Sequence, residues 1–428
     1  MPSAHSRLQR RLTDPTDLRL LAALLGLLFL SVPVISGVSG SLGDAVGAAA
    51  GLYSLLPIAT RSHRAPRLRI AIAALVLAYL FSSVGAPQHG YQGLRHTAST
   101  AAAGSAILLF ATYGKEMVAY RWFRGWAYAL VTIGVLAVNF GHMSKNATGG
   151  AVAYLVAFMM SLLIYSKPQK SWFYAGTFFL VTGTLAFLLD FRGLVAYTAV
   201  LILGYWGAKV LSRKTFWLIG VVGCITWVSA LTWYFLHTFT SPRAFTVSQW
   251  IALHTGRPAT SGRQVLWPAI TRAVAGHEWT GLGAGALPRD ILNTELSSHS
   301  TYMQTYLQLG YIGVILIAVV LLTLWSRLAL HGCNESSRFG AAVLLMYVVH
   351  NSTEVLMFEN RLMAAIPAWC AIGLAISLVG SAEEADREIT PANGSGDGVA
   401  AWDESEGRAM SVRPIDLAGN SAASGGGR

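Results

Sequence analysis

The feature that most constrains this 428-residue chain is its series of uncharged apolar stretches, many of them 16 to 22 residues long. A helix needs about 20 residues to cross a hydrocarbon core of about 30 Å. Inside that core each backbone N–H and C=O must be paired within its own element, so such stretches fold as helices. The composition agrees, because only 12% of the residues are charged, whereas a soluble domain carries roughly 25%. The sequence predicts an all-α polytopic membrane protein.

We expect about twelve transmembrane helices and one long extracytoplasmic loop. The expected spans are 18–36, 41–60, 70–86, 97–113, 125–141, 150–166, 172–189, 193–210, 215–236, 300–326, 339–356 and 361–379. This divides the chain into helices one to nine (1–236), the long loop (237–299), helices ten to twelve (300–380) and a tail (381–428). The tail is rich in Gly, Ser and acidic residues without apolar periodicity, which predicts disorder. Long loops tend to carry function.

The basic residues predict the orientation of the chain in the membrane. With the N-terminus inside, 22 of the 31 Lys and Arg residues fall in the two tails and in five short loops, and nine fall on the opposite side. Cytoplasmic loops are enriched in Lys and Arg, so both termini are expected in the cytoplasm. The richness in Ala, Gly, Val and Arg suggests a bacterial protein of the cytoplasmic membrane. The formal charge of +11 is then a consequence of topology and does not indicate a nucleic-acid partner.

Polar residues on the expected outer side gather in four clusters. These are 142–150, 190–193, the loop segments 259–267 and 297–302, and 350–361. Ionisable residues near a membrane are costly to keep, so each is a functional hypothesis. Trp267 and Pro268 suggest that one loop helix lies on the membrane surface. Four clusters on one side suggest a joint external site.

Arg192 and Arg263 are the candidate anion-binding residues. A guanidinium matches phosphate oxygens in a bidentate fork. Arg263 follows Ser261, which is able to cap a short helix whose N-terminal N–H groups also favour anions. The alternatives are an interfacial arginine snorkelling to headgroups for Arg192 and a surface charge for Arg263.

His299 and Glu354 are the candidate proton-transfer and carboxylate residues. His299 is expected to begin the tenth span next to the long loop, and histidine is the commonest proton-transfer group near neutral pH. Its alternative role is structural. Glu354 lies near the outer end of the eleventh span, where a carboxylate needs an arginine partner or ligand hydroxyls. A structural ion pair and a substrate contact both remain open.

Several site classes are excluded or disfavoured. The segment GLGAG (281–285) follows no strand and is interpreted as a turn, not as a dinucleotide loop. The outer acids are scattered, which disfavours a metal site because hard cations need clustered oxygen ligands. The three cysteines imply no disulfide framework. We expect no cofactor.

The clusters, in this order, resemble the O-antigen ligase and Wzy-type polysaccharide polymerase superfamily. The matching segments are HSTY (299–302) with Gly310 and Gly313, SGRQVLW (261–267), WTGLG (279–283), DFRG (190–193), HMSKNATGG (142–150) and HNSTEVLMF (350–358). The similarity covers roughly 130–375. Two positions depart from the family pattern, since Ser300 replaces the usual Asn and Phe191 the usual Ser.

The resemblance implies a GT-C membrane glycosyltransferase that works without a metal. Its donor would be an undecaprenyl-diphosphate-linked glycan on the outer face of the membrane, and its acceptor a glycan or another macromolecule. Arg192 and Arg263 would bind the diphosphate, and His299 would assist the acceptor hydroxyl. Glu354 would contact sugar or hold an arginine. The outer turn with Lys145 and Asn146 would add substrate contacts. The sequence does not distinguish a ligase from a polymerase.

Two other functions stay open. Twelve spans with cytoplasmic termini also fit a secondary transporter, although transporters place ionisable residues near mid-membrane, often in two related halves. A peptidoglycan-type glycosyltransferase would use the same lipid carrier but act through an outer Asp, and Asp290 is the loop Asp available.

Overall fold

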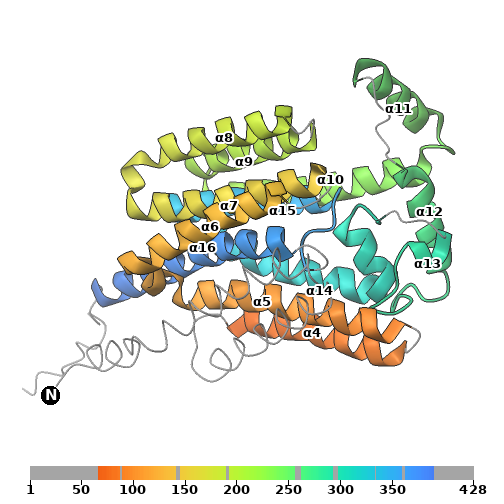
Figure 1. Ribbon diagram of the computed structural model, residues 1–428, viewed down its shortest axis with the longest axis horizontal. Coiled ribbons are helices and arrows are strands. Elements are labelled where there is room, and N and C mark those ends of the chain that lie inside the picture. The colour runs from red at the N-terminus through yellow and green to blue at the C-terminus, as the bar shows by residue number, and fades with distance from the viewer. Residues whose placement is uncertain are drawn as a thin grey trace, which may run out of the picture. The chain divides into compact units, whose positions relative to one another are not determined.

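The structure is a computed structural model and describes residues 66–86, 89–140, 145–188, 192–255, 262–292, 297–332, 334–358 and 362–389. These residues form helices and no strand (Figure 1). The chain divides into two compact units, Met1–Glu384 and Ala385–Arg428. The described helices belong to the first unit, except for the end of α16.

The helices follow one another along the chain with short connections. They are α4 (Pro66–Gly85), α5 (Gly90–Ala119), α6 (Arg121–Phe140), α7 (Lys145–Ser166), the 3₁₀ turn η2 (Pro168–Lys170), α8 (Ser171–Leu188), α9 (Arg192–Val210), α10 (Arg213–His237), α11 (Pro242–Thr255), α12 (Arg263–Ala273), α13 (Arg289–Leu292), α14 (Thr301–His331), α15 (Glu335–Asn351) and α16 (Leu362–Ile389).

Among the described residues, five helical segments are long and apolar enough to cross a membrane. They are Pro66–Gly85, Thr148–Ser166, Gly193–Val210, Arg213–His237 and Thr301–His331. The most apolar part of the α7 segment is 83% buried within the protein, whereas that of the α10 segment is 11% buried. Helix α7 is thus a central helix, and α10 a peripheral one whose apolar side chains face outward. The fold agrees with a helical membrane protein.

The predicted spans from 70–86 onward each coincide with a helix, and the first two (18–36 and 41–60) lie outside the described residues. The boundaries differ at several helices. Helix α5 extends well beyond the predicted span 97–113 at both ends. The eleventh span was predicted to end at residue 356, but α15 ends at Asn351 because the polar run that follows forms turns. Helix α16 continues to Ile389, past residue 381 where the tail was predicted to begin, because SAEEADREI contains good helix formers.

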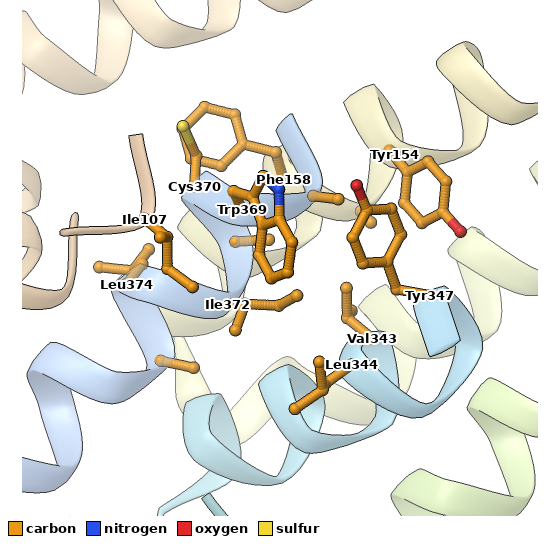
Figure 2. Close-up of a cluster of buried hydrophobic side chains, with 14 of the residues drawn as sticks. Ile107, Tyr154, Phe158, Val343, Leu344, Tyr347, Trp369, Cys370, Ile372 and Leu374 are labelled. Carbon is orange, nitrogen blue, oxygen red and sulfur yellow. The ribbon is translucent and has the colours of Figure 1, made fainter. Parts of the chain in front are cut away.

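The central core is formed by large side chains from α5, α7, α15 and α16. Figure 2 shows Tyr154 and Phe158 of α7 near Tyr347 of α15 and Trp369 of α16. The rings of Tyr347 and Trp369 meet edge to face with centroids 4.9 Å apart, an arrangement that aromatic pairs prefer. This core fixes the end of α15, where the candidate site lies.

A second apolar cluster holds α12 and the residues that follow it against α10 and α14. It contains Phe235, Leu266, Trp267, Ile270, Val274, Ala286, Met303 and Leu307. The Trp267 ring is 1% exposed and packs edge to face on Phe235 with centroids 4.7 Å apart. Trp267 therefore packs against the protein, and the prediction that its helix lies on the membrane surface cannot rest on this side chain. Its indole N–H donates to the Ser298 carbonyl over 2.9 Å, so it is a buried anchor for α12.

Helix α14 is broken at Gly310, where φ is +61°. The segment 278–283 fills the break. The N–H of Leu282 donates to the Leu307 carbonyl (2.8 Å), and the N–H of Tyr311 donates to the Glu278 carbonyl (2.8 Å). A Cβ on Gly310 would lie 2.4 Å from the Glu278 carbonyl oxygen. The GLGAG turn thus satisfies backbone groups that the break exposes, as buried backbone requires.

Candidate active site

The site is built around the turn that ends α15. The Asn351 side chain accepts from the Thr301 hydroxyl (2.7 Å) and from the Leu356 N–H (3.1 Å). The Thr301 N–H donates to the Glu354 carbonyl over 3.2 Å. These bonds join the start of α14 to residues 351–356, although the two segments lie about fifty residues apart in the sequence. A polar run that would otherwise continue the helix is therefore held as a buried turn.

Arg263 reaches this turn from the first position of α12. The N-cap of α12 is Gly262 at φ +84°, without a side-chain cap, and Ser261, the expected cap, lies outside the described residues. The Arg263 side chain is buried, its Nη2 donates to the Thr353 carbonyl over 2.7 Å, and its guanidinium lies 5.6 Å from the Phe235 ring centre. Its Nε has no hydrogen-bond partner among the described residues.

His299 lies two residues before α14, whose N-cap is Ser300. Its φ is +50°, a left-handed conformation that residues other than glycine seldom adopt. Such strain costs roughly 1–3 kcal/mol and is found most often at functional sites. The side chain is 24% exposed, and its Nδ1 has no hydrogen-bond partner in the described part of the chain. The imidazole is thus partly accessible to solvent, and the backbone that carries it has an unusual conformation.

Glu354 lies near both His299 and Arg263. Its carboxylate Oε2 lies 3.9 Å from Nδ1 of His299, too long for a hydrogen bond but within ion-pair distance, and its side chain is 4% exposed. Burial lowers the pKa of Arg263, while the nearby Glu354 carboxylate opposes that shift. Arginine stays charged in proteins, so the shift expresses the cost of burying the guanidinium. Of the predicted residues, the structure brings Arg263, His299 and Glu354 into one site.

The aromatic wall of the site was missed from the sequence. The Tyr197 hydroxyl and the Thr353 hydroxyl are hydrogen-bonded. The His350 ring stacks on Tyr197 with centroids 4.1 Å apart, and its Nδ1 bonds the Tyr154 hydroxyl over 2.9 Å. His350 belongs to a predicted cluster but was not singled out. A tyrosine inside an apolar span is expected to be a core residue, so the sequence offered no signal that Tyr154 and Tyr197 lie beside the site.

The three other predicted substrate-binding residues open two of the helices around the site. Lys145 and Asn146 begin α7, and Arg192 begins α9. Their side chains lie outside what the structure describes. Helices α7 and α9 carry Tyr154 and Tyr197, so these helix starts belong to the same end of the bundle as His350.

The chemistry of the site is that of an anion-binding group beside a base. Arg263 offers a buried N–H donor, and His299 offers a ring nitrogen within ion-pair distance of a carboxylate. No group of three or more His, Cys, Asp or Glu among the described residues is placed to hold a metal ion.

A groove of about 540 Å³ lies between α4, the GLGAG turn and α14. None of Arg263, His299 and Glu354 lines it, so its size does not mark the site.

Comparison with known proteins does not add a family. No family model matches the sequence, and a search of curated proteins finds no similar sequence.

Proposed function

We propose that this protein transfers or polymerises a glycan from an undecaprenyl-diphosphate-linked donor on the outer face of the cytoplasmic membrane. The observation that carries the proposal is the convergence of Arg263, His299 and Glu354 from three separate segments. Arg263 suits the diphosphate leaving group, His299 the acceptor hydroxyl and Glu354 the sugar.

The reaction follows from these groups. The acceptor hydroxyl gives its proton to Nε2 of His299 while its oxygen attacks the anomeric carbon. The bond from that carbon to the diphosphate oxygen breaks, and the electron pair stays on the diphosphate. Arg263, with Arg192 on the resemblance described above, stabilises the developing charge. Preorganised donors of this kind supply a large share of many rate enhancements. Direct attack inverts the anomeric centre.

Glu354 supports His299 in this scheme. A carboxylate beside Nδ1 favours the tautomer with a proton on Nδ1, which leaves Nε2 free to accept a proton. It also stabilises the imidazolium that forms as the hydroxyl is deprotonated. The distance between the two groups is 3.9 Å, and catalytic hydrogen bonds are often long before substrate binds.

The membrane assignment supports the choice of donor. Nucleotide sugars are cytoplasmic, so a glycosyltransferase acting outside needs a lipid-linked donor. The twelve-span topology with both termini in the cytoplasm, which we propose from the distribution of basic residues, would put the site on the outer side.

A secondary transporter is the second candidate, favoured by the broken helix α14, since discontinuous helices are common in transporters. Here the break is filled by residues 278–283, and a Cβ on Gly281 would lie 2.5 Å from the Gln308 carbonyl carbon of the α14 backbone. A substrate or ion would have to displace this turn.

The test is deletion of the gene in the organism that produces the protein, followed by analysis of envelope glycans. We expect lipid-linked glycan to accumulate at the outer face. Wild type should relieve the accumulation, and Arg263→Ala should not. Arg338→Ala is the matched control, because Arg338 is an arginine paired with Glu335 at the end of α15 away from the candidate site.

Two results would contradict the proposal. Accumulation of glycan at the cytoplasmic face would indicate a transporter. Full relief by Arg263→Ala at normal protein level would reduce that arginine to a structural role.

A further inference from the structure

Helix α11 exposes a row of large apolar side chains in a segment too short to span a membrane. Val247, Trp250 and Leu253 follow one another at intervals of three residues, and their exposed fractions are 48%, 59% and 82%. Phe245 at 48% and Phe239, just before the helix, at 66% enlarge the apolar surface. Soluble surfaces seldom gather this much exposed apolar area without a partner.

The opposite side of α11 faces the protein. Ala244 is buried, and Ser248, Ile251 and Ala252 are half-buried. Their spacing places them together on one helical face. The Trp250 row lies on the other side of the helix and is exposed. Figure 1 shows α11 projecting from the bundle beyond the end of α10.

The position of α11 identifies what meets this row. Four residues separate α11 from His237, the end of the candidate spanning helix α10. Such a link reaches at most about 14–18 Å, so α11 begins close to the membrane surface. A helix of 14 residues is about 21 Å long, shorter than a hydrocarbon core of about 30 Å, so it cannot cross.

The residue types also suit a lipid surface. Helix α11 contains Trp250, Arg243 and His254 but no acidic residue. The His254 ring lies against Trp250 with centroids 4.3 Å apart, which places a polar ring beside the indole. Tryptophan and basic residues are the ones enriched where a chain meets the lipid headgroups.

We propose that α11 lies in the outer interface of the bilayer, with Val247, Trp250 and Leu253 inserted among the acyl chains below the headgroups. The sequence had suggested this role for the helix containing Trp267, but the Trp267 side chain is buried against the protein. The proposal depends on the exposed row and on the link to α10, and not on glycan transfer.

The experiment places a fluorescent label at single cysteines in the full chain after the three native cysteines are replaced. Trp250→Cys and Leu253→Cys probe the row, and Ala275→Cys, exposed in the turn after α12, is the control. The protein is reconstituted in phosphatidylcholine and phosphatidylglycerol vesicles that carry a doxyl quencher at carbon 5 or carbon 12 of the acyl chain. Aqueous iodide is the opposing quencher.

We expect the 5-doxyl lipid to quench labels at 250 and 253 several-fold more than the label at 275, and the 12-doxyl lipid to quench them less. Iodide should quench the label at 275 more strongly than the labels at 250 and 253. Adding Trp250→Glu to the 253-labelled chain should reduce lipid quenching, because a carboxylate resists insertion.

Iodide quenching at 250 and 253 equal to that at 275, without lipid quenching, would overturn the proposal. Protection from both quenchers would also overturn it, because the row would then be covered by protein, such as a second copy of the chain. Leu253 is 82% exposed, so its replacement keeps the test valid if the Trp250 variant fails to fold.

Discussion

Helix α15 carries Glu335 at its first position, and Glu354 follows three residues after its last. Around Glu335 the charges are paired at short range. Lys209 lies 3.1 Å and Arg338 2.7 Å from its carboxylate, and the Ser171 hydroxyl donates to it over 3.1 Å. The Tyr205 hydroxyl donates a further hydrogen bond. This end of the helix joins α8, α9 and α15.

The Glu354 end is built differently. Arg263 Nε and His299 Nδ1 lack hydrogen-bond partners in the described structure, and the backbone of His299 is strained. Satisfied polar networks rigidify a protein, whereas unsatisfied buried groups destabilise it and persist where function requires them. The comparison agrees with the proposal made above, in which the first end of α15 stabilises the fold and the second carries the chemistry.

The largest difference between the two ends should appear in His299→Ala. A general base contributes about 10²–10⁴-fold to a rate, so turnover should fall by that factor while donor binding persists. The two quantities are measured separately on purified protein. Glu335→Gln, at the other end of α15, is the control and should keep its turnover. Loss of binding together with unfolding would make His299 a structural residue.

The second-largest difference between the two ends should appear in Arg263→Ala. Removing one charge-assisted contact to the leaving group costs about 2.7–4 kcal/mol of transition-state stabilisation, or on the order of 10²–10³ in rate. Arg263→Lys should also be poor, since an ammonium does not reproduce the bidentate fork. Kinetics of both variants beside Arg338→Ala check this. Equal rates in Arg263→Ala and Arg338→Ala would remove the contrast between the ends.

Glu335→Gln should affect stability and leave turnover per folded molecule unchanged. Burial alone raises the pKa of Glu335, but hydrogen bonds from Tyr205, Lys209 and Arg338 outweigh it and hold the pKa below its ordinary value. The group is partly solvated, so we expect a loss of about 1 kcal/mol. Thermal unfolding of wild type and variant measures it.

The pH dependence of that loss has a definite sign. A carboxylate with a lowered folded pKa stabilises the protein above its unfolded pKa of about 4.3, and this contribution disappears as the pH falls through the folded value. The difference between wild type and Glu335→Gln should therefore be largest near pH 7 and vanish in acid. A difference that grows in acid would contradict the pairing.

The smallest effect should come from chelation. Neither end of α15 gathers three metal-ligating side chains among the described residues, so excess EDTA should leave transfer unchanged. The check is a rate with EDTA and after addition of Mg²⁺ or Mn²⁺. Strict restoration by a metal would count against charge stabilisation by arginines alone.

Hydropathy predicted most helices because apolar length and the absence of charge decide which segments become spans. It failed at 352–356, because long-range bonds from Thr301 hold this segment as a turn. The role of GLGAG in filling the break at Gly310 was also missed. The two segments lie about thirty residues apart, and a one-residue break does not alter the hydropathy of α14.

The candidate site was predicted in part. Arg263, His299 and Glu354 were found because ionisable residues stand out against apolar spans. Tyr154 and Tyr197 were not, because an aromatic residue in an apolar helix looks the same in a core as beside a site. Their role depends on His350, which reaches both rings from α15.

The most direct measurement follows the fate of the donor. Purified wild-type protein is reconstituted in vesicles with an undecaprenyl-diphosphate-linked glycan and an acceptor glycan. We predict release of undecaprenyl diphosphate in step with formation of a new glycosidic bond of inverted configuration, and neither product with His299→Ala. Intact donor moved across the membrane, with no bond broken, would contradict the account.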